Sequence, residues 1–389
     1  QAIKLTEIVS QPEKEMILFA KAFNAGHNNA MKRHAQTMHR LCPDDEWILN
    51  WVGKYYFING DYKNAALYYK RAIKQNETFI PAFKMLGQSM VELGQLDKAE
   101  QNFKKYIQLL PKNADPYITY ANLLKKQGRF DQATEHYKKA FNMDPQNAHI
   151  YKDLGDIALF MGNTQLARKY YRDFHKHAAT LAQRFWALRL EASVNLYENK
   201  FEDAKRVMSE YLVLARDLER PYYQFYGKTY QGYILTVEGQ IQQGLNQYRE
   251  ARQIATNSKM KEKLKKNLIT QSYLLEYNAM AENGGIKEPK SVKCKCEEML
   301  ADVKDPQQWE HYNRMCGIIE MNHGHFRKAR RYLKKAGDHP ATWYYMALVY
   351  NKSGRDKKAH QWYQKVVDHR NNSIYLSTVR KQALANVLE

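Results

Sequence analysis

One spacing of 34 residues dominates the N-terminal half of the sequence. A glycine recurs at this spacing at Gly26, Gly60, Gly94, Gly128 and Gly162. An alanine follows in the same register at Ala65, Ala99, Ala133 and Ala167, and an aromatic residue at Tyr69, Phe103, Tyr137 and Tyr171. A period of this length is typical of solenoids, in which similar units stack and each contacts only its neighbours. The repeat therefore indicates one quasi-linear stack rather than a set of unrelated globular domains.

Each unit contains two amphipathic stretches that predict a helical hairpin. In residues 80–113 the first stretch places apolar residues at helical spacing, at Phe83, Leu86, Met90 and Leu93. Gly94 interrupts the pattern, and a second stretch runs through Leu96, Ala99, Phe103, Tyr106 and Leu110 to Pro111. Gly87 and Ala99 are small where the two helices must approach closely, and Phe103 fills the remaining space. Helices of about 13 residues cannot bury such a face alone, so neighbouring hairpins must stack.

The pattern resembles the tetratricopeptide repeat, a family built from stacked helical hairpins. In residues 148–181 the matching residues are Tyr151, Leu154, Gly155, Gly162, Ala167 and Tyr171. Residues 46–79, 80–113 and 114–147 match the repeat pattern about equally well. Residues 12–45, 185–218 and 225–258 match it more weakly. The resemblance implies an all-α fold, a right-handed superhelical α-solenoid of about ten antiparallel helix hairpins.

Three segments are expected along the chain. Residues 1–255 form an N-terminal repeat array, with strict repeats at 46–181 and weaker ones at 12–45 and 185–255. Residues 256–309 form a degenerate helical pair with a loop at 283–290, where the sequence contains glycine and proline. Residues 310–389 return to the repeat pattern and end in a capping helix. The sequence leaves open whether 256–309 continues the solenoid or forms a hinge.

The sequence carries no signature of catalysis or of a metal site. It has neither a Gly-rich phosphate loop that follows a strand nor a nucleophile-elbow serine. Cys294 and Cys296 are separated by one residue, which is a poor spacing for zinc, and on a helix they would point about 200° apart. Cys316 lies on a predicted packing face, where cysteine acts as a small apolar residue. We therefore expect a protein that is not an enzyme and that uses no cofactor and no metal.

In tetratricopeptide proteins the first helix of each hairpin lines a concave groove, and the resemblance implies the same arrangement here. The groove positions counted along the repeat are Trp47, Asn50, Lys54, Lys84, Gln88, Asn122, Lys125, Lys152, Trp186, Arg189, Tyr226, Tyr233 and Arg314. Lys, Arg and Asn side chains suit an extended acidic or polar peptide. We therefore expect a scaffold that binds a protein or peptide within a multiprotein assembly. We do not expect the carboxylate clamp of chaperone-binding members, because Asp153 would repel a carboxylate.

The net charge of +20 supports an alternative hypothesis. Two basic segments, 259–267 (KMKEKLKKN) and 327–335 (RKARRYLKK), could bind an anionic polymer, either nucleic acid or an acidic polysaccharide. Neither segment has the interleaved aromatic residues on which single-strand binders stack bases. Nucleic acid is therefore the less favoured partner, and the oligomeric state is open.

The compartment stays open as well. The sequence has no apolar run of about 18 residues that would span a membrane, so we expect a soluble protein. The first residues, QAIKLTEIVS, contain neither an initiator Met nor the apolar core of a signal peptide. They fit an exported, periplasmic protein whose signal has been removed, and they also fit a cytoplasmic protein.

Overall fold

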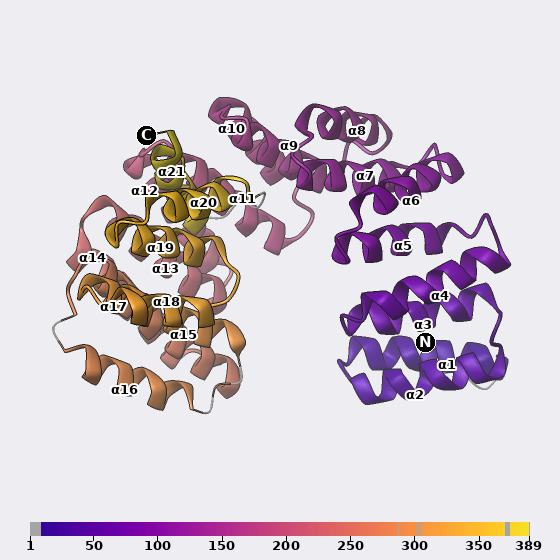
Figure 1. The fold of residues 1–389 in the computed structure, drawn as a ribbon, viewed down its shortest axis with the longest axis horizontal. Helices are drawn as coiled ribbons and strands as arrows, with labels where there is room; N and C mark the ends of the chain where they lie inside the picture. Colours follow the sequence, from indigo (N-terminus) through magenta and orange to yellow (C-terminus); the bar gives the residue numbers. More distant parts are fainter. Residues whose placement is uncertain (1–8, 287, 302, 304, 370–373, 389) are drawn as a thin grey trace. The chain divides into compact units, whose positions relative to one another are not determined.

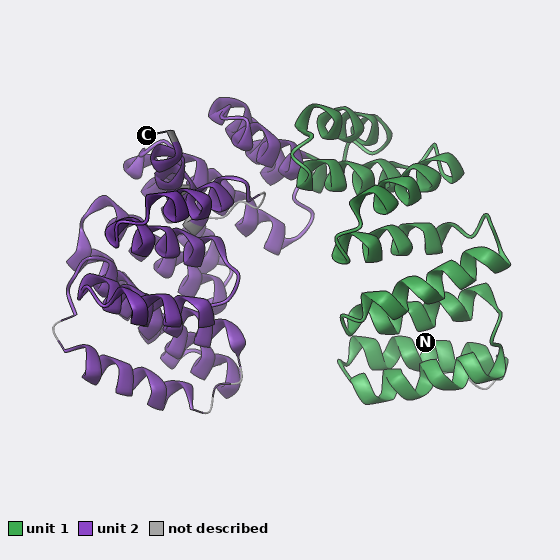
Figure 2. Ribbon diagram, viewed as in Figure 1, with its two compact units in different colours: residues 1–150 green, residues 151–389 purple. Residues whose placement is uncertain are grey.

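The computed structural model describes residues 9–286, 288–301, 303, 305–369 and 374–388, and within these ranges it contains helices and no strands. Figure 1 shows successive helices running back and forth as hairpins that stack side by side. The predicted all-α solenoid is confirmed: the described residues form twenty-one helices, which is ten hairpins and one further helix at the C-terminus. The chain divides into two compact units, residues 1–150 and 151–389, which Figure 2 colours separately.

Unit 1 is a regular stack of four hairpins. Its helices are α1 (Gln11–Asn24), α2 (Asn28–Leu41), α3 (Glu46–Ile58), α4 (Tyr62–Gln75), α5 (Ile80–Glu92), α6 (Leu96–Leu109), α7 (Ala114–Lys126) and α8 (Phe130–Met143). Each odd-numbered helix of unit 1 packs against the next helix of its own hairpin, and α3, α5 and α7 also pack against the preceding hairpin. Side-chain caps fix several starts: the carboxylate of Asp45 accepts a hydrogen bond from the amide of Ile48 at 2.9 Å, and Asp61 caps α4 in the same way.

The turn inside each hairpin of unit 1 uses the repeated glycine. Gly94 and Gly128 have φ angles of +71° and +77°, in the left-handed region that other residues rarely adopt. The amide of the following residue, Gln95, closes the turn by donating to the carbonyl of Met90 at 2.8 Å. The glycine register read from the sequence therefore corresponds to the C-terminal ends of the first helices.

Unit 2 contains longer and less regular helices. After α9 (Ala148–Phe160), in which the division between the units falls, they are α10 (Thr164–Lys176), α11 (Leu181–Tyr197), α12 (Phe201–Asp217), α13 (Pro221–Glu238), α14 (Ile241–Asn257), α15 (Glu262–Glu282), α16 (Pro289–Leu300), α17 (Pro306–Asn322), α18 (Phe326–Lys335), α19 (Pro340–Lys352), α20 (Asp356–Val367) and α21 (Ile374–Leu388). α13 and α14 approach closely, because a Cβ on Gly244 would lie 2.8 Å from the carbonyl oxygen of Gly232. Glycine at position 244 is therefore required by packing despite its low helix propensity.

The segment without a consensus repeat is helical and packed into unit 2. α15 is 21 residues long and packs against α13, α14, α16 and α17. Cys296 of α16 and Cys316 of α17 are buried in one apolar cluster, whereas Cys294 is exposed. The two cysteines of the C-K-C sequence thus point in different directions. Burial raises the pKa of the Cys316 thiol to about 11, so this cysteine is an apolar packing residue.

The C-terminal helix α21 makes contacts that the repeat pattern does not predict. It packs against its neighbours α19 and α20 and also against α11, far away in sequence. The Tyr233 hydroxyl on α13 is hydrogen bonded to the Thr378 hydroxyl, and the guanidinium carbon of Arg380 lies 4.6 Å from the ring centre of Phe160 on α9. α21 therefore joins the beginning of unit 2 to its end.

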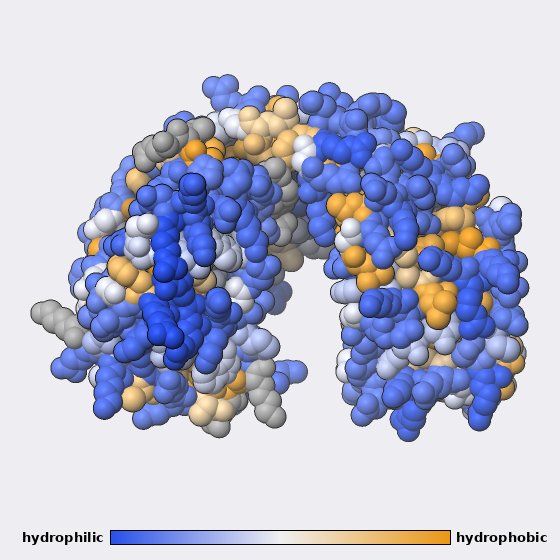
Figure 3. All heavy atoms as spheres, viewed as in Figure 1, coloured by the Kyte–Doolittle hydropathy of each residue, from blue (hydrophilic) through white to orange (hydrophobic). Residues whose placement is uncertain are grey.

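The exposed surface of both units is mostly hydrophilic, as the face in Figure 3 shows, with small separate apolar patches. Exposed large apolar side chains are scattered among many helices, among them Trp47, Leu67 and Met161. None of the helices in the described ranges is long and apolar enough to cross a membrane.

Candidate partner-binding surface

We call the exposed faces of the first helices of the hairpins the first-helix surface; it comprises α3, α5 and α7 in unit 1 and α9, α11, α13, α15, α17 and α19 in unit 2. In unit 1 several predicted groove residues on this surface are engaged within the protein. The Lys84 ammonium is bound to the carboxylate of Asp115 at 2.8 Å. Asn122 accepts a hydrogen bond from the hydroxyl of Tyr137 at 2.7 Å, so it supports a core tyrosine.

The remaining predicted residues of unit 1 differ in accessibility. Trp47 is 52% exposed and packs edge-on against Phe79, with ring centres 4.9 Å apart. Lys54 lies over the ring of Trp51 at 4.7 Å. Asn50, Gln88 and Lys125 are half-buried. In unit 1, Trp47 is therefore the predicted groove residue that offers the largest apolar surface to a partner.

Lys152 of α9 lies in a half-buried acidic environment. Its ammonium contacts the carboxylates of Asp153 at 2.6 Å and Asp156 at 2.9 Å. Burial disfavours the charged amine, but the two carboxylates outweigh it and raise the pKa of Lys152. The same ammonium lies 5.3 Å from the ring centre of Trp186 on α11, so the charge is partly shared with an aromatic face. Lys152 thus holds α9 to α11 and is poorly placed to attract a distant anion.

A hollow lined by aromatic residues lies between α11 and α13 in unit 2. It has a volume of about 360 Å³ and is open to solvent. Its lining residues are Ala182, Phe185, Trp186, Arg189, Tyr211, Tyr222, Tyr223, Tyr226 and Tyr230. Among the predicted groove residues, the structure brings Trp186, Arg189 and Tyr226 together here. We call this feature the aromatic hollow.

The walls of the aromatic hollow are held by contacts among its own rings. Phe185 and Tyr223 stack with ring centres 3.9 Å apart, and Tyr222 meets Tyr226 edge-on at 4.9 Å. The hydroxyl of Tyr226 donates to Gln271 of α15 at 3.3 Å. Desolvation raises the pKa of Tyr226, so its hydroxyl stays neutral and can act as a hydrogen-bond donor or acceptor at neutral pH. The hollow is therefore formed before any ligand arrives.

Arg189 supplies the positive charge of the aromatic hollow. Its guanidinium carbon lies 5.4 Å from the ring centre of Tyr230, which holds the side chain against the wall. A guanidinium has five N–H donors, and two of them can bind a carboxylate through parallel hydrogen bonds.

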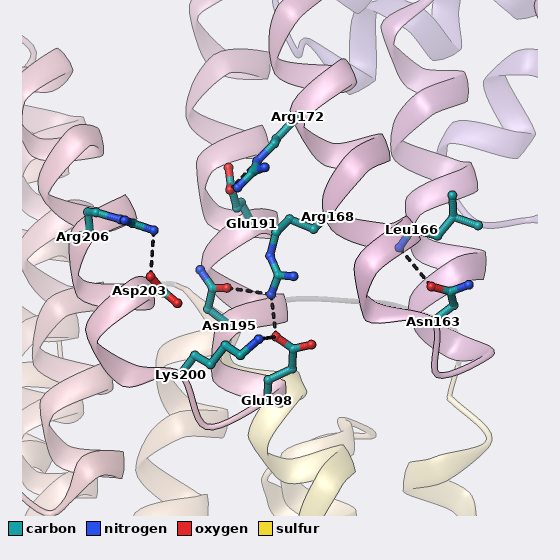
Figure 4. Close-up of polar contacts among 10 residues, drawn as sticks. All are labelled: Asn163, Leu166, Arg168, Arg172, Glu191, Asn195, Glu198, Lys200, Asp203 and Arg206. Carbon is teal, nitrogen blue, oxygen red and sulfur yellow. Dashed lines mark hydrogen bonds and ion pairs between the residues drawn. The ribbon is translucent and has the colours of Figure 1, made fainter.

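A polar network fixes the helix that carries Trp186 and Arg189, as Figure 4 shows. Arg168 of α10 donates to the side-chain oxygen of Asn195 at 3.0 Å and to the carboxylate of Glu198 at 2.5 Å. Lys200 adds a second contact to Glu198 at 2.9 Å. Burial opposes the charge on Glu198, but hydrogen bonds from Thr164, Lys200 and Arg168 outweigh it and lower the pKa of Glu198 to about 2.

One further ion pair ties α10 to α11, and a side-chain cap fixes the start of α10. Arg172 of α10 donates to Glu191 of α11 at 3.0 Å, and Asn163 caps α10 by accepting from the amide of Leu166 at 3.0 Å. Arg206 and Asp203 form a separate pair within α12 at 2.7 Å. The contacts of Arg168 and Arg172 therefore hold α11, which carries one wall of the aromatic hollow, against α10.

The last two predicted groove residues lie farther along unit 2. Tyr233 is bonded to Thr378 of α21, so its hydroxyl is engaged within the chain. Desolvation lowers the pKa of Arg314, whose guanidinium interacts with the carboxylate of Glu282. Desolvation also raises the pKa of Glu282, although this residue is exposed at the surface. The Tyr345 hydroxyl donates to Glu282 at 2.6 Å. Glu282, Arg314 and Tyr345 thus form a polar cluster on α15, α17 and α19 that is distinct from the aromatic hollow.

Sequence reasoning missed several residues of the hollow. Tyr222, Tyr223 and Tyr230 lie outside the counted groove positions, yet all three line it. The signal was present, because residues 221–233 contain five tyrosines and a phenylalanine. Such a density of aromatic residues exceeds what one helix needs for a packing stripe. Among the described residues, no group of three or more His, Cys, Asp or Glu side chains is arranged to hold a metal ion.

The fold and the repeat register define an α-solenoid of helical hairpins. Family models described as tetratricopeptide repeats match residues 48–79 and 90–137, and one described as a TPR repeat matches 121–162. Residues 48–79 and 90–162 of the chain are therefore tetratricopeptide repeats. No curated protein matches the chain as a relative.

Solved structures of this repeat class resemble parts of the chain. A crystal structure of MamA is 21% identical over 41% of this chain and 94% of its own, with a TM-score of 0.37. TTC0263, a thermophilic TPR protein of Thermus thermophilus, is 19% identical over 48% of this chain and 99% of its own, with a TM-score of 0.42. MamA from Desulfovibrio magneticus RS-1 is 15% identical over 43% and 96%, with a TM-score of 0.39.

Proposed function

We propose that the protein is a non-catalytic scaffold that binds a segment of a partner protein on the first-helix surface of unit 2. Repeats of this family bind protein partners generally. The observation that supports this particular site is the aromatic hollow, where Trp186, Arg189 and four tyrosines, Tyr222, Tyr223, Tyr226 and Tyr230, meet in one open hollow. Trp, Tyr and Arg are the residues most enriched among those that dominate binding energy at protein interfaces.

The chemistry of the hollow indicates the partner's anchor. A large apolar or aromatic side chain would bury its surface against Trp186 and the tyrosine rings. A carboxylate next to that side chain would pair with Arg189. The partner segment is therefore a peptide in which an aromatic or long aliphatic residue is flanked by Asp or Glu. Because the hollow is already formed, little ordering free energy is lost on binding.

A displayed library of random peptides tests the proposal with the full-length protein as bait. Selection is expected to enrich sequences with a large apolar residue beside an acidic one. Selection repeated with Trp186→Ala should lose this enrichment, whereas Trp47→Ala, which removes an exposed tryptophan from unit 1, should keep it. Enrichment that is unchanged by Trp186→Ala, or a motif without an apolar anchor, would contradict the proposed site.

A further inference from the structure

The helix α18, which is the second helix of its hairpin in unit 2, presents a continuous cationic face to solvent. Five of its side chains are exposed Lys or Arg residues: Arg327, Lys328, Arg331, Lys334 and Lys335. The opposite face, with Ala329 and Leu333, is buried. None of the five cations forms an ion pair with the part of the chain that the structure describes, in contrast to Lys205 and Arg168, which are paired.

The charge of this region is one-sided in the sequence as well. Between residues 321 and 355, Asp338 is the single acidic residue, and its carboxylate is bound to Lys365 at 2.7 Å. The pKa of Asp338 is lowered, and the largest cause is its hydrogen bond with Lys365. The strongly hydrophilic side chains that gather over α18–α20 on the visible face of unit 2 can be followed in Figure 3. Two carboxylates of the neighbouring helix α17 lie close to this face, because Glu320 interacts electrostatically with Lys328 and Glu310 lines the same hollow as Lys335. Within the described residues, neither carboxylate forms an ion pair with a cation of α18.

The cationic face extends from α18 onto the next hairpin. The Arg330 guanidinium of α18 and the Lys358 ammonium of α20 both lie over the ring of Tyr350 on α19, at 5.5 Å and 5.9 Å. Lys352 at the end of α19, Arg355 at the N-cap of α20 and Lys357 in its first turn are exposed. The two second helices thus form one cationic surface that is bridged by Tyr350, and its exposed carboxylates among the described residues are Asp338, Asp356 and Asp368. We call it the α18–α20 surface.

We propose that the α18–α20 surface is a second docking site, and that its partner is an acidic helical segment of another protein. The cations Arg327, Arg331 and Lys334 follow one another by four and three residues, so they repeat about every 4.5–6 Å along one helix face. On a partner helix, carboxylates that are four and three residues apart are separated by the same distance of about 4.5–6 Å along the helix axis. An acidic helix lying along α18 can therefore pair with each cation in turn.

The other anionic partners fit this surface less well. Single-stranded nucleic acid is bound through exposed aromatic platforms, but Tyr350 is covered by two cations. A membrane-surface helix inserts large apolar side chains, but no large apolar residue of α18 or α20 is exposed. The site is independent of the aromatic hollow, because it involves other helices and needs charge rather than an apolar anchor.

The test compares probes on the full-length protein by fluorescence anisotropy. The first probe is a helical peptide with Glu at four- and three-residue steps; the second has the same composition with its Glu residues scrambled; the third is a DNA duplex. The first is expected to bind at low salt, to weaken steeply as salt rises, and to bind at least several-fold more tightly than the scrambled peptide.

Matched charge reversals locate the binding. Arg327→Glu with Arg331→Glu should weaken the helical peptide about tenfold or more, since two attractive pairs become repulsive. Lys105→Glu with Lys138→Glu changes the net charge equally at exposed positions of unit 1 and should have little effect. Circular dichroism confirms that each variant is folded. Three outcomes would overturn the proposal: equal binding of the scrambled peptide, tighter binding of the duplex, or equal losses in both variants.

Discussion

Gly87 of α5 lies directly against the ring of Phe103 on α6: a Cβ added to Gly87 would lie 2.3 Å from Cε1 of Phe103. The same contact recurs one repeat earlier, where a Cβ on Gly53 would lie 2.7 Å from Tyr69, and two repeats later between Gly155 and Tyr171. In these three hairpins the first and second helices approach so closely that an aromatic ring fills the place of a side chain.

Gly87→Ala tests this close approach. The added methyl group forces the buried Phe103 ring or one of the helices to move, although alanine favours the helix. We expect a loss of about 1–3 kcal/mol in the free energy of unfolding, measured by urea denaturation. Gln88→Ala, the next residue of the same helix, is the control and should change stability by about 0.5 kcal/mol or less. Equal stability of Gly87→Ala and wild type would contradict the packing.

Gly128→Val tests the turn between α7 and α8. Its φ of +77° is accessible to glycine but strained for a β-branched residue, so we expect a cost of about 1–3 kcal/mol and a lower melting temperature by circular dichroism. Gly128→Asn should cost clearly less, because asparagine tolerates the left-handed region. If the two variants melted together, backbone conformation could not be the cause.

Glu198→Gln tests the network that supports the aromatic hollow. The folded-state pKa of Glu198, about 2, is below the ordinary value of 4.5, so the ionised carboxylate stabilises the folded state above about pH 4.5. This contribution is lost as pH falls toward 2. The stability difference between wild type and Glu198→Gln should therefore be largest at neutral pH, at about 1–3 kcal/mol, and shrink in acid. A difference that is independent of pH would show that Glu198 is not charged in this network.

Tyr233→Phe tests the attachment of α21 to the beginning of unit 2. The change removes the hydrogen bond to Thr378 and is expected to cost about 0.5–1.5 kcal/mol. Hydrogen exchange of the backbone amides in 374–388 should become faster, because the helix is held less firmly. Tyr222→Phe, at an exposed position, is the control and should leave exchange in α21 unchanged. Unchanged exchange in the Tyr233 variant would mean that this hydrogen bond does not help to hold α21.

The sequence was sufficient to predict the hairpins of unit 1, because the repeated glycine, alanine and aromatic residues each have a local structural cause. Gly60 and Gly94 adopt the positive φ of the turn, and Tyr69 fills the space beside Gly53. Local periodicity cannot predict the contact between Tyr233 and Thr378, which are 145 residues apart, since it depends on how helix lengths accumulate through unit 2. The predicted division of the chain into three segments, with boundaries at residues 255 and 309, stays a prediction. The two compact units of the structure are divided elsewhere, at residue 150.

The candidate site was predicted in part for the same reason. Counting repeat positions selected Trp186, Arg189 and Tyr226, which the structure brings together in one hollow, and their role in binding a partner stays a prediction. It could not show that Lys152 is held by Asp153 and Asp156, because position in a repeat says nothing about neighbouring charges.

The most direct test of the account is the affinity of a peptide with a large apolar residue beside an acidic one, measured by titration calorimetry against the full-length protein. Trp186→Ala is expected to weaken binding by about 2 kcal/mol or more, which is about thirtyfold, and Arg189→Ala by a smaller amount. Trp47→Ala should bind as wild type does. Binding that survives Trp186→Ala unchanged, or that is lost equally in Trp47→Ala, would contradict the aromatic hollow as the binding site.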